Sequence, residues 1–313
     1  MRKTLLNAKH LRSEEAALRF LEQLRWPNGI RCPRCEYPKV YRMARKGKVN
    51  KQTGKRGPDR EILKCAGCRK QFSAIVGTVF EDSHLPLTLW LQAMQLMCSS
   101  KKGISSHQLH RMLDVTYKTA WFLTHRIRHA MGDLITTEKM GGRATDGVQY
   151  KVVEVDETYI GTGKRSPRRG SRAHKIPVVA LVERGGRVRS KIMPKVTANN
   201  LKAAIRTNVK PDSFIITDSF KGYHGLDREV NVHETVNHYK KEYVRGQIHT
   251  NTIEGYFSLL KRGLTGTFHH VSQKHLQRYL DEFSFRYNNR TETDAMLAAL
   301  AVKATDGKRL QYQ

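Results

Sequence analysis

The sequence predicts an α/β protein in which a domain built on a mixed sheet follows a small metal-binding ribbon and a helical segment. Two Cys-x-x-Cys pairs near the N-terminus predict the ribbon. Helical periodicity between Leu85 and about Met131 predicts the helical segment, and strand-like runs alternating with helical patterns after residue 150 predict the sheet domain. The expected divisions are 1–80 for an N-terminal helix and four-cysteine zinc ribbon, 81–140 for a helix-turn-helix-like region, 145–290 for the sheet domain and 291–313 for a C-terminal helix and tail.

The four cysteines of the ribbon are Cys32, Cys35, Cys65 and Cys68, with twenty-nine residues between the two pairs. Four thiolates complete a tetrahedral shell around Zn²⁺ and leave no open position for water. We therefore expect a structural zinc, which stabilises a segment too small to build its own core. Disulfide pairing of the same cysteines is the alternative. The N-terminus carries no secretory signal pattern, so we expect a cytoplasmic chain with reduced thiols, and zinc is favoured.

The chain is strongly basic, with 57 Lys and Arg against 28 Asp and Glu and a formal charge of +29. Ten of the basic residues lie between Lys39 and Lys64, among several glycines. This composition predicts a basic loop or hairpin that contacts DNA phosphates without reading sequence, although a solvated surface is the alternative. A membrane is the competing polyanion, but the sequence has no twenty-residue apolar span and no basic amphipathic anchor. No glycine-rich phosphate loop indicates ATP use.

Residues 103–121 have the pattern of a helix-turn-helix. The second helix is expected over Thr116–Arg128, with Tyr117, Lys118 and Thr119 near its N-terminus facing the major groove of DNA. An ordinary helical hairpin without base contacts is the alternative. The inner face is expected to comprise Ile104, Leu109, Met112, Leu113 and Val115.

Strand and helix signals alternate in the sheet domain, and the order is that of a mixed α/β fold. The continuous apolar run at 178–182 is suited to a central strand, whereas the next strand alternates apolar with basic residues and is more exposed. An antiparallel meander is therefore expected to open the sheet. Strands are expected near 151–156, 176–183, 187–194, 213–218 and 230–236, and helices over Ala198–Val209, around Leu276 to Tyr287 and over Ala295–Lys303.

Three carboxylates and one lysine stand out in this domain. Asp156 and Asp218 each end a strand-like run, and Glu254 lies at the start of a helix. Lys261 lies seven positions after Glu254, which is two helical turns, so both side chains point along the same flank. Carboxylates from separate elements are the usual ligands of a hard divalent cation in phosphodiester chemistry. The apolar stripe of the same helix is expected to comprise Ile253, Tyr256, Phe257, Leu260 and Leu264.

Residues 155–161 (VDETYIG), 217–219 (TDS) and 249–254 (HTNTIE), continuing to Lys261, resemble the DDE-type transposases of bacterial insertion sequences, in the group with an N-terminal zinc ribbon. The resemblance implies a ribonuclease-H-like catalytic core and two Mg²⁺ ions per active site, for which Mn²⁺ can substitute. It implies double-stranded DNA partners, namely the element ends and a target, which are cleaved and joined by strand transfer. It also implies a homo-oligomer in the DNA complex and a cytoplasmic, nucleoid-associated location. The family's metal ligands fall on Asp156, Asp218 and Glu254, and its lysine falls on Lys261.

Each of these residues also has a structural interpretation. Glu154 and Glu157 flank Asp156 and are rivals for the first metal position. Asp218 is also suited to start a turn after its strand. Residues 251–254 fit a capping box, in which an asparagine caps the helix and Glu254 returns a hydrogen bond. Lys261 is also compatible with a solvated surface lysine.

A basic loop after the first catalytic strand is a further candidate for DNA contact, with a solvated loop as its alternative. Its proposed contact residues are Lys164, Arg165, Arg168 and Arg169. Two other functions also remain open at this stage. One is a noncatalytic DNA-binding regulator derived from a transposase, and the other is a structure-selective ribonuclease-H-like nuclease. Strand transfer distinguishes a transposase from both.

Overall fold

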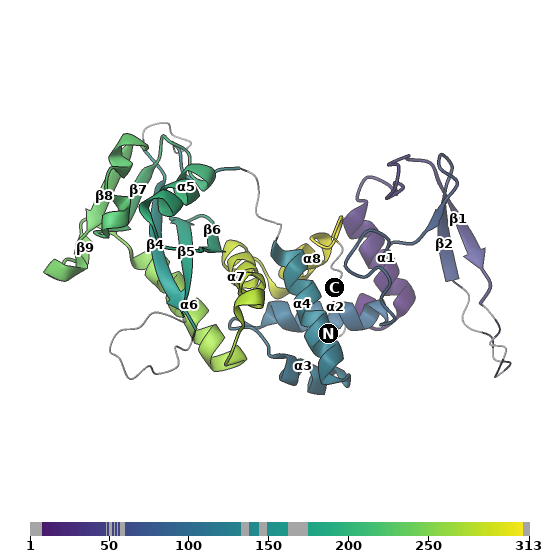
Figure 1. Ribbon diagram of the computed structural model, residues 1–313. Coiled ribbons are helices and arrows are strands. Elements are labelled where there is room, and N and C mark those ends of the chain that lie inside the picture. Colours follow the sequence, from purple (N-terminus) through teal and green to yellow (C-terminus); the bar gives the residue numbers. More distant parts are fainter. Residues whose placement is uncertain are drawn as a thin grey trace. The chain divides into compact units, whose positions relative to one another are not determined.

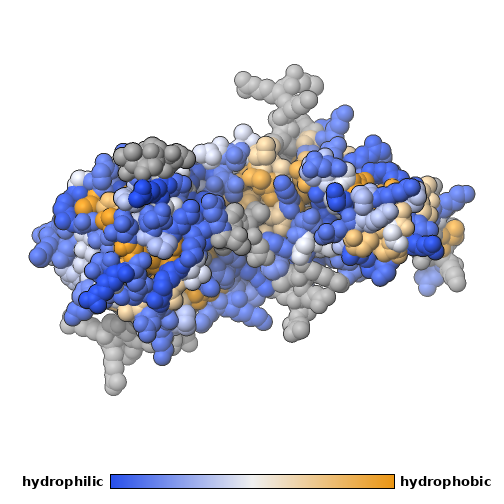
Figure 2. Space-filling view, turned by 90° about the horizontal axis from the view of Figure 1, so that it is seen from above, coloured by the Kyte–Doolittle hydropathy of each residue, from blue (hydrophilic) through white to orange (hydrophobic). Residues whose placement is uncertain are grey.

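The computed structural model describes residues 8–47, 49, 52, 54, 56, 60–132, 138–143, 149–161 and 175–308 (Figure 1). The chain forms two compact units. The N-terminal unit comprises Met1–Ser99, Leu109–Ala130 and Asp294–Gln313, and the sheet unit comprises Ser100–Gln108 and Met131–Thr293. Both units expose a largely hydrophilic surface in the view of Figure 2, as expected for a chain with 57 basic residues. Among the described residues, no helix combines the length and apolar character needed to cross a membrane.

The zinc ribbon of the N-terminal unit is a three-stranded antiparallel sheet in the order β1-β2-β3, with β1 at Val40–Arg45, β2 at Arg60–Cys65 and β3 at Gln71–Phe72. The β1–β2 pairing confirms that the basic segment between the cysteine pairs is a hairpin. Its small core consists of buried Cys32, Leu63, Cys65 and Phe72, with Trp26 packed against it. So few apolar residues supply little hydrophobic stabilisation, which is the situation in which a metal ion is needed.

Helices make up the rest of the N-terminal unit: α1 (Glu14–Arg25), α2 (Leu87–Ser99), α4 (Tyr117–Gly132) and α8 (Asp294–Lys303), with α3 (Ser106–Leu113) shared between the two units. Ser13 caps α1 through a hydrogen bond from the Ala16 amide to its Oγ atom (3.2 Å). The Glu14 carboxylate in turn accepts the amides of Leu87 (2.6 Å) and Thr88 (3.2 Å). Free amides at the start of α2 are thus satisfied by a side chain from α1.

Helix α8 packs against α1 and α2, so the two ends of the sequence share one core. Its buried face includes Leu297, Ala301 and Val302. Arg25, at the end of α1, connects this helix to the residues after α8 and to the segment after β3. Its guanidinium donates to Asp306 Oδ1 (2.5 Å), to Val76 O (2.9 Å) and to the carbonyl of Ala74. The sequence predicted the helix but not its place in the N-terminal unit.

The sheet unit contains a five-stranded mixed sheet in the order β6-β5-β4-β7-β8, which confirms the predicted α/β class. The strands β4, β5 and β6 form the predicted antiparallel meander, whereas β7 pairs parallel to β4 and β8 parallel to β7. The first strand is longer than predicted and reaches Ile160, because its second half continues to pair with β5. The strands are β4 (Val152–Ile160), β5 (Ile176–Glu183), β6 (Val188–Ile192), β7 (Phe214–Asp218) and β8 (Val232–Val236).

Helices cover both faces of this sheet. Helix α5 (Ala198–Asn208) packs on one face through Leu201 and Ile205. Helices α6 (Asn251–Gly263) and α7 (Gln273–Asn288) pack on the other face. A two-stranded hairpin of β9 (Val244–Arg245) and β10 (Ile248–His249) lies in the sequence between β8 and α6. The predicted apolar stripe of α6 is confirmed, since Ile253, Tyr256, Phe257, Leu260 and Leu264 are all buried.

The Arg25→Met substitution is expected to destabilise the N-terminal unit by on the order of 3 kcal/mol. The arginine side chain is 2% exposed, and its loss leaves two carbonyls without their donor. The matched control is Arg19→Met on the same helix, because Arg19 pairs with Glu15 at 67% and 75% exposure and should change stability by less than about 1 kcal/mol. Urea unfolding of both variants measures the difference. Equal effects would contradict the role given to Arg25.

Candidate active site

The parallel pairing of β4 with β7 brings two of the predicted carboxylates together. In this register Val152 lies beside Phe214 and Glu154 beside Ile216. Side chains of a strand alternate between its faces. Two residues further along each strand, Asp156 and Asp218 therefore emerge side by side on one face of the sheet.

The third carboxylate comes from the helix that covers this same face. Ile160 and Val178, on the side of the sheet that Asp156 shares, belong to the core that contains Ile253 and Leu260 of α6. Glu254 lies in the first turn of α6 and is half exposed. Its Oε1 atom accepts a hydrogen bond from Thr250 Oγ1 (2.8 Å) and lies 3.7 Å from His238 Nε2.

Burial and neighbouring negative charges both act on these carboxylates. Burial raises the pKa of Asp156 to about 7, and the negative charges of Glu157, Asp218 and Glu254 act in the same direction. Burial also raises the pKa of Asp218, against the opposing effects of the Phe220 amide and of His238. Carboxylates that repel one another in a half-buried setting form a donor set that a divalent cation would neutralise. Carboxylate oxygens are donors that suit Mg²⁺, while binding of the ion by these residues stays a prediction.

The two rival glutamates have other partners. Glu157 emerges on the opposite face of β4, where its Oε2 atom accepts the hydroxyl of buried Tyr223 (2.8 Å). Glu154 is fully buried, and its carboxylate accepts Arg184 Nε (2.6 Å), Thr252 Oγ1 (2.8 Å) and the Ile253 amide (2.9 Å). Neither neighbour occupies the position that Asp156 takes beside Asp218.

The capping-box interpretation of residues 251–254 is wrong. Asn251 is the first residue of α6, and Thr250 precedes the helix without a side-chain cap. The acceptor for the helix amide comes instead from Glu154 on β4. Glu254 is thereby left at the surface, half exposed.

Lys261 lies on the exposed flank of α6, two turns after Glu254, as predicted. A π-helical turn, Leu264–Phe268, extends the same helix. Sequence reasoning missed His238, which lies in a single helical turn after β8 and contacts Glu254. A lone histidine in a polar segment has no distinguishing local pattern, and its position between Asp218 and Glu254 was the one available signal.

The four ribbon cysteines converge as predicted. Cys32 Sγ lies 3.7 Å from Cys68 Sγ, and Cys35 Sγ lies 3.6 Å from Cys65 Sγ. All four sulfur atoms lie within 4.8 Å of one another, and none of these cysteines forms a disulfide. Tetrahedral Zn²⁺ with Zn–S bonds of about 2.3 Å requires sulfur atoms roughly 3.8 Å apart, so the cluster fits a structural zinc better than a pair of disulfides.

Two domain families and two related proteins match this chain. Residues 148–288 match the ISXO2-like transposase domain, and residues 12–71 match the transposase zinc-ribbon domain. A protein of the transposable element ISH50 from Halobacterium salinarum is 30% identical over 293 residues, which cover 88% of this chain and 90% of that protein. The chain belongs to the ISXO2-like transposase family. A transposase-like protein of Haemophilus influenzae is 33% identical over 98 residues, which cover 31% of this chain and 78% of that protein.

Membership of the ISXO2-like transposase family explains the fold of the sheet unit. A mixed sheet with helices on both faces is the ribonuclease-H-like arrangement expected of such a transposase domain. The matched segments also contain every residue proposed for the two sites: the three carboxylates and Lys261 lie within 148–288, and the four cysteines lie within 12–71.

The predicted helix-turn-helix of this ISXO2-like transposase consists of α3 and α4, joined by the three residues from Asp114 to Thr116. Thr116 Oγ1 accepts the Thr119 amide (3.2 Å) and caps α4. Tyr117 and Lys118 are exposed and Thr119 is half-buried, so the helix start presents these side chains, while their contact with DNA stays a prediction. Met112 was predicted on the inner face, but the structure shows it 52% exposed. Leu109 is the residue of α3 that is buried in the core of this hairpin.

The basic-loop residues Lys164, Arg165, Arg168 and Arg169 lie outside the described residues. Their proposed role in DNA contact therefore stays a prediction.

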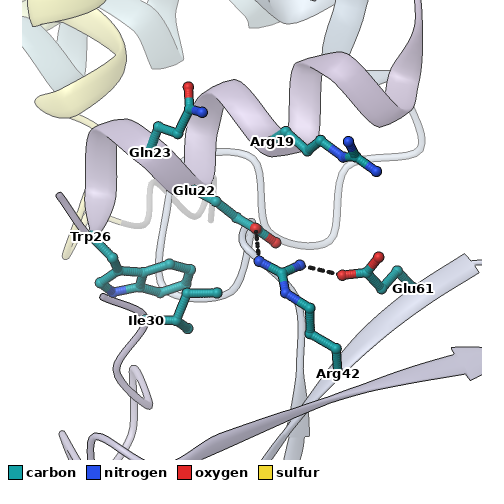
Figure 3. Close-up of a pocket in the computed structure, with 7 residues that line it drawn as sticks. All are labelled: Arg19, Glu22, Gln23, Trp26, Ile30, Arg42 and Glu61. Carbon is teal, nitrogen blue, oxygen red and sulfur yellow. Dashed lines mark hydrogen bonds and ion pairs between the residues drawn. The ribbon is translucent and has the colours of Figure 1, made fainter. Parts of the chain in front are cut away.

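A cavity of about 440 Å³ lies in the N-terminal unit, between α1 and the ribbon hairpin (Figure 3). Arg42 reaches across it and bonds the carboxylates of Glu22 (2.7 Å) and Glu61. These two partners raise the pKa of the guanidinium, and they match its positive charge. Arg42 is thus a basic hairpin residue that is already engaged by carboxylates and is poorly suited to phosphate contact.

Zinc removal is expected to disorganise the ribbon of this ISXO2-like transposase. The Cys65→Ser substitution removes a buried thiolate, so the bound zinc should be lost and proteolysis within the ribbon should accelerate. Cys98→Ser is the control, since Cys98 is buried in α2, away from the cluster. Zinc content by elemental analysis and limited proteolysis measure the outcome. Retention of one zinc per chain in the Cys65 variant would contradict the assignment.

The raised pKa of Asp156 predicts the pH dependence of stability without Mg²⁺. The folded protein keeps this carboxyl protonated up to about pH 7, whereas the unfolded chain releases the proton near pH 3.8. The folded state therefore loses stability as pH rises between these values. Asp156→Asn cannot ionise, so its melting temperature should exceed that of the wild type by a margin that grows from pH 5 to pH 7.5. Asp212→Asn, in the exposed turn that precedes β7, should follow the wild type.

Proposed function

We propose that the protein is a DNA transposase that binds the ends of an insertion sequence and catalyses Mg²⁺-dependent strand cleavage and strand transfer. The observation that supports this proposal is that Asp156 and Asp218 lie on neighbouring parallel strands, on the face of the sheet that is covered by the helix carrying Glu254. Membership of the transposase family supports the same conclusion.

The three carboxylates would hold two Mg²⁺ ions, with Mn²⁺ as a substitute. Bound there, the cations would activate water or a 3′ hydroxyl and stabilise the leaving oxygen of the scissile phosphate. Asp156 would be shared between the two ions, with Asp218 completing one site and Glu254 the other. Lys261, exposed on the same flank of α6 as Glu254, would contact the DNA backbone beside the reacting phosphate.

The N-terminal unit would supply DNA recognition. Tyr117, Lys118 and Thr119, at the start of α4, would read the major groove as the first turn of a recognition helix does. The basic ribbon hairpin would add phosphate contacts that are independent of sequence. Because a transposition reaction joins two element ends, the DNA complex would contain more than one copy of the chain.

The proposal is tested by incubating the purified protein with Mg²⁺, DNA that carries the flanking element ends and a supercoiled target. Asp218→Asn keeps the size of the side chain and removes a cation ligand, so joined products should fall roughly a thousandfold or more. DNA binding measured by electrophoretic shift should be spared. Asp212→Asn is the matched control, because this exposed aspartate lies in the turn that precedes β7, at the end opposite to Asp218, and should leave the products unchanged.

The products distinguish the competing functions. Joined DNA that depends on Asp218 supports the transposase. Cleavage without joining would favour a structure-selective nuclease, and DNA binding without either reaction would favour a regulator derived from a transposase.

A further inference from the structure

We propose that Glu154 and Arg184 are a positioning pair that fixes the first turn of α6, and with it Glu254, against the strand that carries Asp156. The pair binds no metal itself. The inference deepens the proposed function and rests on it, because it assigns the residues that set the spacing between two of the cation ligands.

The first observation is the complete engagement of a buried carboxylate. Glu154 is 0% exposed. Its Oε1 atom accepts Arg184 Nε (2.6 Å) and Thr252 Oγ1 (2.8 Å), and its Oε2 atom accepts the Ile253 amide (2.9 Å). An ionised carboxylate in this environment persists only when its charge and its lone pairs are matched, and these three donors match them. The Glu154 carboxylate therefore binds donors of the protein rather than a metal ion.

The second observation is where the bonded atoms lie in the sequence. Glu154 precedes Asp156 by two residues on β4 and shares its face of the sheet. Ile253, which donates its amide to Glu154, directly precedes Glu254 on α6. Two hydrogen bonds, from Thr252 and Ile253 of α6 to Glu154 of β4, therefore join the two elements one or two residues away from the two ligands. Displacement of these bonds would displace Glu254 relative to Asp156.

The third observation is that Arg184 forms hydrogen bonds with the segment that directly precedes α6. Arg184 directly follows β5, and its own amide donates to Val152 O (3.0 Å). Its guanidinium donates to Gln247 O (2.7 Å) and to His249 O (2.8 Å), in addition to Glu154. The arginine thus ties the β9–β10 hairpin to the sheet just before the helix begins. Positive charge on Arg184 and the positive end of the α6 dipole both stabilise ionised Glu154.

Outer partners of metal ligands of this kind typically change metal affinity or activity by about 10-fold to 100-fold when they are removed. Glu154→Gln keeps the size of the side chain but removes the charge and one acceptor. We expect this variant to bind Mn²⁺ with the wild-type stoichiometry and roughly tenfold weaker affinity. Glu254→Gln should instead lose bound Mn²⁺, because it removes a ligand.

The experiment measures Mn²⁺ binding by electron paramagnetic resonance and amide hydrogen exchange in zinc-loaded protein free of other metals. Exchange at residues 251–257 should accelerate in Glu154→Gln, because the Ile253 amide loses its acceptor. The matched control is Glu282→Gln. Glu282 is also fully buried and bonded to an arginine, Arg286, but both residues lie on α7. It should lower the melting temperature without changing Mn²⁺ affinity.

A milder variant tests the proposal if Glu154→Gln fails to fold. Thr252→Val removes one neutral donor to Glu154 and leaves the charge pair intact, so Mn²⁺ affinity should weaken by only a few-fold.

Each outcome decides one of the proposals. Loss of Mn²⁺ stoichiometry in Glu154→Gln would show a direct ligand and overturn the positioning role. Unchanged affinity in both Glu154→Gln and Thr252→Val, with lowered melting temperatures, would show a merely structural role and also overturn it. Absence of Mn²⁺ binding to the wild type that depends on Glu254 would instead reject the proposed two-metal function, which is a separate result from failure of the positioning pair.

Discussion

The pairing of β4 with β7 is the constraint on which the candidate active site depends. Paired residues on neighbouring parallel strands direct their side chains to the same face of the sheet. The register that pairs Glu154 with Ile216 therefore also places Asp156 next to Asp218, two residues further along each strand. The antiparallel meander on the other side of β4 buries the strand and lowers the polarity around these acids. Burial, with a smaller contribution from neighbouring negative charges, raises the pKa of Asp156, so the fold bears a cost for the ionised form of this carboxyl.

Local patterns were sufficient to predict most elements of the sheet unit. The expected strands and the stripe on α6 correspond to observed elements within a few residues, because each buries one apolar face with a regular period. Spacing between cysteines likewise predicted the cluster that fits zinc. Met112 shows where the same reasoning failed: an apolar residue at helical spacing was assigned to the core, yet the short α3 buries mainly Leu109.

Local sequence patterns could not predict contacts between residues that are far apart in the chain. Glu154 was visible in the sequence as a rival of Asp156, but its bond to the Ile253 amide joins residues ninety-nine positions apart. No periodicity encodes such a pairing, so residues 251–254 were also compatible with a self-contained capping box. Similarly, the sign that His238 belongs to the candidate site is its short distance to Glu254 in the folded structure. The catalytic pattern was recognisable by its resemblance to a family, while the residues that hold the pattern in place became visible only in three dimensions.

The location of α8 has a consequence for synthesis on the ribosome. Its buried face completes the core formed with α1 and α2, and Asp306 provides the partner for Arg25. Translation produces the whole sheet unit before this helix emerges. The N-terminal unit therefore reaches its final packing only after the sheet unit has been made, and a product interrupted before Asp294 would carry the carboxylates without a finished N-terminal core. Premature termination would therefore yield a sheet unit that is complete up to Thr293 together with an N-terminal unit that lacks part of its core.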